Sequence, residues 1–455
     1  MQVITTWTGQ YADTLRRALR MTNESFADHL SVAVRTVANW RARPEIVPLA
    51  SVQRILDTAL ENAPGRAKAQ FALLLGEVGG NAAGTTTAPL SVPLDAMTKH
   101  EWSRDDAHLL SRSFDAALER SAVEDVERLS HMWLIAVPPQ IIELEAGRRV
   151  SDDLVAAVEC RVIQLRRADD FITGPTSHEL VLNELRATTQ LLTDASLTEG
   201  QARRLLTATG ELAQLGAWVA ADTGLLDNAA RYVRGGVLAS RAALNASLAA
   251  NIISTFSYQV ANNGNPREAT ILALTAYHGA WHDATPIARA LFLERVAWAA
   301  AKSDDLGACE RALGQVEDAF LSGTRDDDPD WVYWLNHEEI DVMAGRCYTE
   351  LRQPSKAENL LTGAIARYDQ TLIRENSLYL SWLAEDYVQL GDVDQAAEIA
   401  SRMAALAART NSARTDTRLR YIASQLAPYK DTASVADFFD AYETAEHAER
   451  DDHQS

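Results

Sequence analysis

Residues 21–40 read MTNESFADHLSVAVRTVANW, and this stretch decides the fold at the N-terminal end of the chain. Apolar residues recur at three- and four-residue intervals on both sides of a short break, which indicates two helices. Ala27 is small where the two helices would cross, and Val37 and Trp40 are spaced to pack the second helix onto the first. The spacing predicts a helix-turn-helix, with Ser31 in the tight turn where glycine is preferred.

The second of these helices, residues 34–41, leaves its outer face free to enter a DNA major groove. Arg35 can donate two hydrogen bonds to a guanine edge, Asn39 can pair with adenine, and Val34 can touch a thymine methyl group. The residues predicted to face base edges are Ala33, Val34, Arg35 and Asn39. Those predicted to contact phosphates are Arg16, Arg17, Arg20, Thr36, Arg41 and Arg43. The alternative is an ordinary surface helix without a nucleic acid partner.

The distribution of charge supports a nucleic acid partner for the N-terminal segment alone. The whole chain has a formal net charge of −20, which by itself speaks against DNA binding. Residues 1–75 hold nine basic and six acidic side chains and so carry +3, whereas the rest of the chain carries −23. A small basic segment therefore precedes a large acidic one.

The remaining chain is predicted to be helical. Its 455 residues exceed what one hydrophobic core organises, so more than one unit is expected. Proline is sparse and no run alternates with a period of two, which predicts an all-α protein. The Gly-, Thr- and Ala-rich stretch from Gly76 to Pro93 has no apolar face and is typical of a linker. The expected organisation is a small five-helix-type helix-turn-helix domain at 1–75, a flexible linker at 76–98, helical repeats at 99–443 and a disordered tail at 444–455.

An internal repeat organises the acidic part of the chain. A glycine precedes an alanine by five residues at Gly224, Gly264 and Gly391, and Ser303 and Arg352 replace the glycine in two further copies. The five alanines, at positions 229, 269, 308, 357 and 396, are 40, 39, 49 and 39 residues apart. Each interval is long enough for one helical hairpin, so the pattern predicts a stack of hairpins.

Two successive copies are similar to the tetratricopeptide repeat. The first copy has small, aromatic, alanine, large apolar and alanine residues at the spacing of that pattern, and the second repeats most of them. The matching residues are Gly345, Tyr348, Ala357, Leu361 and Ala364, followed by Ala384, Tyr387, Gly391, Ala396 and Ala400. The period exceeds the usual length of about 34 residues, and generic helical hairpins are the alternative.

The stretch 21–40 resembles the xenobiotic-response-element (Cro/C1-type) repressor family. The wider stretch 7–60 looks like a subgroup from high-GC Gram-positive bacteria, in which such a segment is joined to tetratricopeptide repeats. With the repeats, the resemblance extends over nearly the whole chain, loosely between 95 and 340. It implies that the four base-facing residues contact DNA and that the protein dimerises on inverted half-sites. The departures are Ser31, in place of the turn glycine, and Arg41, in place of a frequent glutamate.

A stack of hairpins is curved, and the first helix of each hairpin lines its concave side. Asparagine side chains in such a groove can pair with both the N–H and the C=O of an extended peptide. The resemblance also implies a peptide-sensing groove. The candidate effector residues are Gln214, Trp218, Asn251, Ser254, Tyr258, Asn262, Glu339 and Arg346. The alternative is that these side chains are solvated or bind neighbouring helices.

No catalytic site, metal site or cofactor is expected. His278 and His282 could share one helix face as metal ligands, but Gly279 weakens the helix between them. The chain has no phosphate-binding glycine loop and no nucleophile elbow. The cysteines lack the spacing of disulfide frameworks or zinc sites, and all three are expected to be buried reduced thiols: Cys160, Cys309 and Cys347.

Two functions are compatible with these features. The first is a transcriptional regulator that binds double-stranded DNA as a homodimer and senses a peptide, a small molecule or a partner protein through its repeats. The alternative is an interaction scaffold whose N-terminal domain binds DNA weakly or docks on a partner. An enzyme is not expected. A cytoplasmic location is expected, since the sequence contains neither a secretory signal nor the roughly 18 uninterrupted apolar residues of a membrane span.

Overall fold

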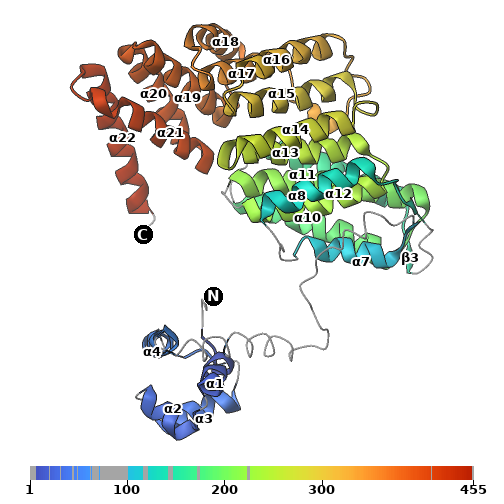
Figure 1. Ribbon diagram of the computed structural model, residues 1–455, viewed down its shortest axis with the longest axis vertical. Helices are drawn as coiled ribbons and strands as arrows, with labels where there is room; N and C mark the ends of the chain where they lie inside the picture. The colour runs from blue at the N-terminus through green and yellow to red at the C-terminus, as the bar shows by residue number, and fades with distance from the viewer. Residues whose placement is uncertain are drawn as a thin grey trace. The chain divides into compact units, whose positions relative to one another are not determined.

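Figure 1 shows the computed structural model, in which the chain divides into two compact units, residues 1–88 and 89–455. We call the first unit the head and the second the body. The structure describes residues 7–19, 21–30, 32–43, 46–48, 50–61, 63, 71, 101–115, 121–141, 147–171, 175–222, 226–410 and 412–452. The predicted linker at 76–98 lies outside these residues.

The head is a set of short helices around one apolar core. Its described residues form α1 (Gly9–Ala18), α2 (Asn23–His29), α3 (Val34–Ala42) and α4 (Ala50–Glu61). Leu15, Phe26 and Leu56 are fully buried between them. The ring of Trp7 stacks on Phe71, with 5.9 Å between the ring centroids. The prediction of a fifth helix falls on residues outside those described.

Helices α2 and α3 pack against each other and against α1 through small and apolar side chains. Ala27 of α2 and Val37 and Trp40 of α3 are buried, as their spacing predicted. A Cβ atom on Gly9 would lie 2.7 Å from the carbonyl oxygen of Trp40, so the approach of α1 to α3 requires glycine. The turn residue Ser31 lies outside the described residues.

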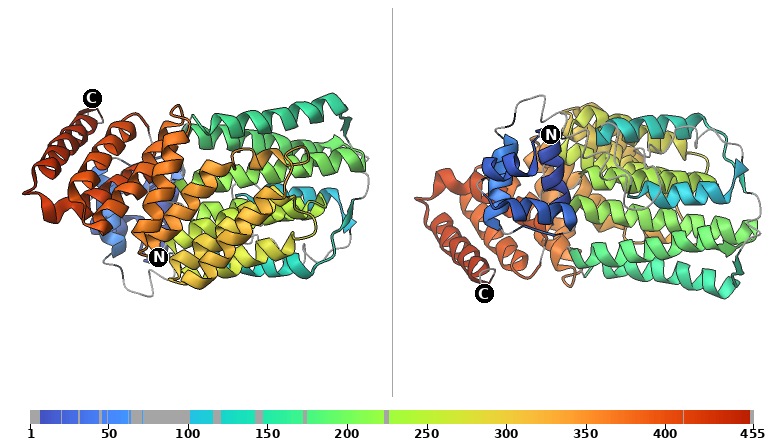
Figure 2. Two further views of the ribbon diagram at one scale, coloured as in Figure 1. Left: turned by 90° about the horizontal axis from the view of Figure 1, so that it is seen from above. Right: turned by 90° about the horizontal axis from the view of Figure 1, so that it is seen from below.

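The body consists of helices that follow one another side by side (Figures 1 and 2). Its first part contains β1 (Glu101–Trp102), α7 (Arg104–Ser113), α8 (Ala122–Ile135), β2 (Gln140–Ile141), β3 (Arg148–Arg149), α9 (Asp152–Ala168), α10 (Pro175–Asp194) and β4 (Ala195–Ser196). Strand β1 pairs in parallel with β2, and β3 with β4. The prediction of a mostly helical protein is confirmed, but it missed these strands, because two residues are too few to show a period of two.

The second part of the body is a run of helical hairpins. The hairpins are α11 (Glu199–Asp222) with α12 (Leu226–Ala242), α13 (Ala246–Asn263) with α14 (Pro266–Gly279), α15 (Pro286–Lys302) with α16 (Leu306–Leu321), α17 (His337–Glu350) with α18 (Pro354–Arg367), and α19 (Ile373–Leu390) with α20 (Val393–Ala407). The 3-10 helix η1 (Asp330–Val332) separates α16 from α17. The chain then continues through α21 (Ala413–Leu426), the 3-10 helix η2 (Ala427–Tyr429) and α22 (Ala433–Asp452).

The alanine repeat of the sequence coincides with these hairpins. Each of the five alanines lies near the start of the second helix of a hairpin, and all except the half-buried Ala308 are fully buried. In the fourth hairpin, a Cβ atom on Gly345 would lie 2.7 Å from Cγ of Leu361, which explains the small residue at that position. The interval of 49 residues arises where the segment 322–336, with η1, is inserted between two hairpins.

Two sequence predictions about the body need correction. Helix α22 continues to Asp452, so most of the tail expected to be disordered from Thr444 is helical, in keeping with its alanine and glutamate content. Cys160 is exposed on α9, whereas Cys309 and Cys347 are buried as expected. Among the described helices, none combines the length and apolar character needed to cross a membrane.

Candidate functional site

A cavity of about 1110 Å³ lies along the inner side of the hairpins. Its walls come mainly from the first helix of each hairpin, α11, α13, α15, α17 and α19, together with α21 and the segment that contains η1. On α13, the lining residues Asn251, Thr255, Tyr258 and Asn262 recur at three- and four-residue intervals and so share one face. The hairpin repeat therefore places polar side chains from distant parts of the sequence around one space.

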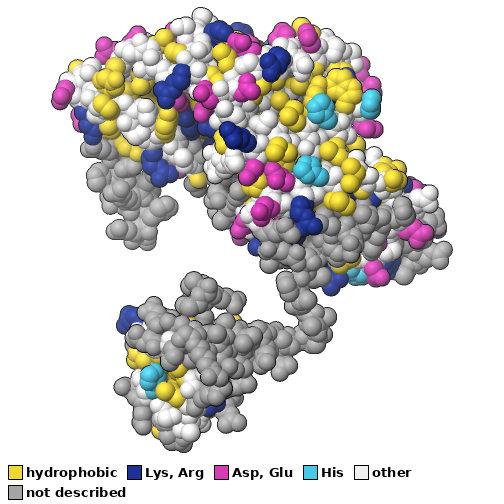
Figure 3. Space-filling model, viewed as in Figure 1, with side chains coloured by type: hydrophobic (Ala, Val, Ile, Leu, Met, Phe, Trp, Pro, Cys, Tyr) yellow, Lys and Arg dark blue, Asp and Glu magenta, His cyan; other side chains and the backbone are white. Residues whose placement is uncertain are grey.

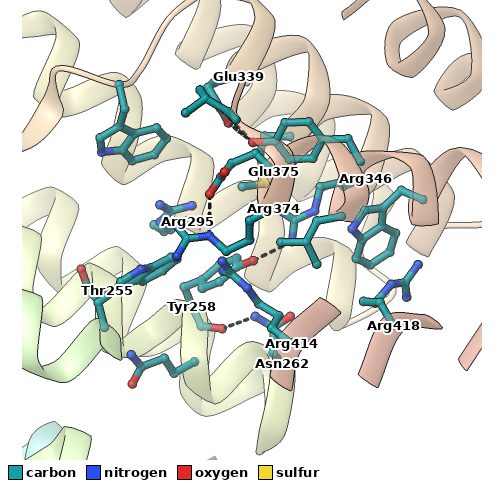
Figure 4. Close-up of a pocket in the computed structure, with 18 of the residues that line it drawn as sticks. Thr255, Tyr258, Asn262, Arg295, Glu339, Arg346, Arg374, Glu375, Arg414 and Arg418 are labelled. Atoms are coloured by element: carbon teal, nitrogen blue, oxygen red, sulfur yellow. Dashed lines mark hydrogen bonds and ion pairs between the residues drawn. The ribbon is translucent and has the colours of Figure 1, made fainter. Parts of the chain in front are cut away.

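Tyr258 lies at the centre of a cluster of aromatic rings and arginines (Figure 4). Its ring stacks on that of Trp218, 6.0 Å away, and lies 6.3 Å from the ring of Trp298. These three aromatic residues come from three successive hairpins and are 40 residues apart in sequence. Arg346 donates a hydrogen bond to the Tyr258 hydroxyl over 2.7 Å, and its guanidinium lies 4.7 Å from the Trp298 ring and 5.0 Å from the Trp382 ring.

The electrostatic potential around Tyr258 is positive. Burial alone would raise the pKa of the Tyr258 hydroxyl, but the positive charges of Arg346, Arg414 and Arg295 outweigh burial and lower that pKa to about 8. Arg414 lies over the Trp218 ring at 4.9 Å, and Arg295 lies over the Tyr258 ring at 4.8 Å. Three guanidinium groups from α15, α17 and α21 thus converge on one phenol.

Arg295 is the most deeply buried of these three arginines. Only 7% of its surface is exposed, and its guanidinium is held between the rings of Tyr258 and Trp334. Burial lowers the pKa of Arg295. Its neighbour Glu294 is also buried, and burial raises the pKa of that carboxyl to about 8, so the uncharged form predominates at pH 7. Glu294 therefore offsets little of the positive charge at neutral pH.

Other carboxylates at the cavity bind groups outside this cluster. Glu339 accepts hydrogen bonds from the hydroxyls of Tyr368 and Tyr379, and burial raises its pKa. Further ion pairs at the cavity include those of Glu385 with Arg418 at 2.8 Å, Glu350 with Lys302 at 2.9 Å, and Glu338 with Arg367 at 3.2 Å. Neither Arg295 nor Arg346 has a carboxylate within ion-pair distance among the described residues.

One side of the cavity is closed by contacts between segments far apart in sequence, which we call the clasp. Arg166 of α9 forms ion pairs with Glu211 at 3.1 Å and with Asp330 at 3.3 Å. Beyond the end of α9, Asp170 accepts a hydrogen bond of 2.5 Å from the Tyr333 hydroxyl, and Asp169 lies 3.8 Å from Arg374 of α19. The inserted segment 322–336 thus contributes to the site as well as lengthening the repeat.

The structure brings together six of the seven groove candidates in the body, with Glu339 beside them. Gln214, Trp218, Asn251, Tyr258, Asn262 and Arg346 all line the cavity. Ser254 does not, because it lies on another face of α13, is buried, and donates its hydroxyl proton to the carbonyl of Asn251. The amide of Asn262 is already used: it donates to the Tyr258 carbonyl and accepts from Trp298. Both groups of Asn262 that would pair with a peptide backbone therefore already have a partner inside the protein.

Several residues of the site were not found from the sequence, namely Arg295, Arg374, Arg414, Arg418 and Trp382. Arg295 lies in α15, which is so rich in alanine and leucine that it is typical of a wholly apolar core helix. One signal was present in the sequence: the aromatic residues at 218, 258 and 298 recur at the repeat interval. If the repeats had been aligned by this aromatic interval, α15 would have been predicted to line the cavity.

In the head, the residues predicted to face base edges are all on the outer side of α3 or directly before it. Ala33, Val34, Arg35 and Asn39 are exposed. Of those predicted to contact phosphates, Arg43 is exposed and Thr36 half-buried. Arg16 instead forms an ion pair with Asp13 at 2.8 Å and donates to the Met21 carbonyl. Arg20 and the side chains of Arg17 and Arg41 lie outside what the structure describes.

The fold and sites define a two-unit helical protein, with a helix exposed for contact in one unit and an arginine-rich cavity in the other. No family model and no curated protein matches this chain.

Proposed function

We propose that the protein is a transcriptional regulator whose head binds DNA through α3 and whose body binds an effector in the cavity. The observation that carries this proposal is the division of α3 into two faces. Val37 and Trp40 are buried against the rest of the head, while Val34, with 41% of its surface exposed, and Arg35 and Asn39 are on the free side. Such a helix can enter a major groove without disturbing the core.

The exposed residues of α3 offer the donors and apolar contact that base recognition needs. Arg35 is suited to the O6 and N7 atoms of guanine and Asn39 to the N6 and N7 atoms of adenine. A head of this size contacts one half-site, so the active species is a homodimer whose two α3 helices are spaced by about 34 Å, one turn of DNA. The resemblance to Cro/C1-type repressors supports this arrangement.

The cavity supports an effector function for the body. Its volume of about 1110 Å³ is sufficient for a small organic molecule. Helices from all five hairpins contribute to its wall, so a bound molecule would contact several hairpins at once. An effector that binds one arrangement of the hairpins better than another shifts the protein toward that arrangement. We propose that this shift changes the spacing of the two heads in the homodimer.

The test is selection of duplexes from a random DNA pool by the full-length protein, followed by affinity measurement on the selected sequence. Arg35→Ala should weaken specific binding by about tenfold or more, because the two hydrogen bonds to guanine are lost. Arg54→Ala, which removes an exposed arginine from α4, serves as the matched control and should change specific binding much less. Equal effects of the two substitutions, or no enriched sequence, would favour the interaction scaffold.

A further inference from the structure

Arg295 and Arg346, two of the arginines around Tyr258, form an anion site for which the described residues supply no carboxylate. Arg295 is more than nine-tenths buried and lines the cavity, yet its guanidinium has no hydrogen bond or ion pair among the described residues. Arg346 uses one Nη atom on Tyr258, and its buried Nε atom has no hydrogen-bond partner there either. A buried guanidinium without an anion is costly, so the cavity is arranged for a ligand that supplies one.

The rings around these guanidiniums fix their orientation. Arg295 is held between Tyr258 and Trp334, and Arg346 lies near the faces of Trp298 and Trp382. Stacking on aromatic faces leaves the planar N–H edge of a guanidinium free to donate, and that edge matches the oxygens of phosphate or carboxylate. The site is thus prepared before the ligand enters.

The number of cations favours a ligand group with more than one negative charge. Two guanidiniums, those of Arg295 and Arg346, act on the same phenol and have no carboxylate partner among the described residues, while the cavity carboxylates Glu338, Glu350 and Glu385 are paired with other cations. A single carboxylate would match one guanidinium. A phosphoryl group carries about two charges near neutral pH and offers three oxygens in different directions.

We propose that the cavity binds a small organic phosphate, whose phosphoryl oxygens accept hydrogen bonds from Arg295 and Arg346. The cavity of about 1110 Å³ has room for the organic part beside this group. The inference rests on the proposed function only in treating the bound molecule as the effector. It departs from the expectation of a peptide held by asparagines, because Asn262 is occupied by Tyr258 and Trp298.

The proposal is tested by calorimetric titration of the full-length protein with pyrophosphate, adenosine diphosphate and citrate. Saturable binding of pyrophosphate or adenosine diphosphate, with citrate bound more weakly, is the expected result. Citrate binding as tightly as either phosphate would overturn the phosphoryl assignment in favour of a polycarboxylate. Absence of binding by both phosphates at millimolar concentration would overturn the site altogether.

Three variants show whether the binding occurs in this cavity. Arg295→Met and Arg346→Met should each weaken phosphate binding by about tenfold or more. Arg367→Met is the control, since Arg367 lines the same cavity but is already paired with Glu338 and Asp341. If Arg295→Met does not fold, Arg346→Lys replaces it, because lysine keeps the charge and loses the planar fork. Unchanged affinity in folded Arg346 variants would exclude the cavity.

These titrations contain no DNA, so their outcome is separate from that of the DNA selection. A protein that binds phosphates but selects no duplex would keep the cavity assignment and lose the proposed regulation. A protein that selects a duplex but binds no phosphate would keep its DNA-binding function and lose this inference.

Discussion

The outer face of α3 and the wall of the cavity use the same residue type in opposite surroundings. Arg35 of α3 is exposed, whereas Arg295 of α15 is 7% exposed and stacked between rings. On the face of the body shown in Figure 3, basic and acidic side chains are interspersed, whereas the cavity gathers arginines around one tyrosine. An exposed arginine keeps its hydration until a partner arrives, while a buried one has lost it on folding. A buried arginine therefore depends on the residues and ligands around it for every interaction.

The largest expected effect tests whether the two regions fold separately. Phe26→Ala, at a fully buried position of the head, should cost about 3 to 5 kcal/mol in that unit. We expect loss of the head's thermal transition and of DNA binding, with phosphate binding by the body retained. Phe256→Ala, equally buried in the body, should have the reverse effect. Differential scanning calorimetry of both variants measures this, and a joint shift of both transitions by Phe26→Ala would contradict it.

A smaller effect tests how closely the hairpins of the body are packed. Gly345→Ala places a Cβ atom 2.7 Å from Cγ of buried Leu361 and should destabilise the body by about 1 to 3 kcal/mol. Gly314→Ala is the control, because its Cβ would meet nothing within 4 Å and alanine favours the helix, so a gain of roughly 0.5 to 1 kcal/mol is expected. Denaturant titration measures both, and the same sign for the two variants would refute the packing argument.

The smallest effect concerns the buried carboxyl group of Glu294, beside Arg295. Burial raises the pKa of Glu294 from 4.5 to about 8, so its contribution to stability is present at low pH and is lost as the pH rises toward 8. Glu294 also faces Glu339, which raises its pKa, and Arg295 and Arg346, which lower it. Glu294→Gln should therefore be more stable relative to the wild type at pH 8 than at pH 5, by about 1 kcal/mol or more.

Thermal melts between pH 5 and pH 9 measure this difference, with Glu317→Gln on the exposed side of α16 as the control. If the wild type and Glu294→Gln melt with parallel pH profiles, the uncharged state assigned to Glu294 is wrong.

Much of the fold could be predicted because it depends on periodic, local packing. The spacing of Ala27, Val37 and Trp40 predicted which side chains of α2 and α3 are buried, and the repeated alanines predicted the hairpins. The cavity was predicted only in part. Its arginines lie on helices whose composition is that of a core, and its closure depends on the inserted segment 322–336, which has no counterpart in the other repeats.

The groove candidates also show why the sequence predicted the positions of residues better than their interaction partners. Register on a helix predicted that Tyr258, Asn262 and Arg346 share one side, and they do line the cavity. The partner of each side chain depends on three-dimensional contacts between hairpins. Asn262, one of the groove candidates, accepts a hydrogen bond from Trp298, and Arg346, another, donates one to Tyr258.

The clasp has a consequence for how the body unfolds. An open array of hairpins contacts only its neighbours and can lose structure one hairpin at a time from either end. Arg166 and Asp170, however, bind Asp330 and Tyr333 across more than 160 residues of chain, and Asp169 approaches Arg374 beyond them. The hairpins between these contacts are enclosed in one long loop. We therefore expect these hairpins to unfold in a single cooperative event, and we expect the entropy of closing that loop to make folding slower than the helical content alone would suggest.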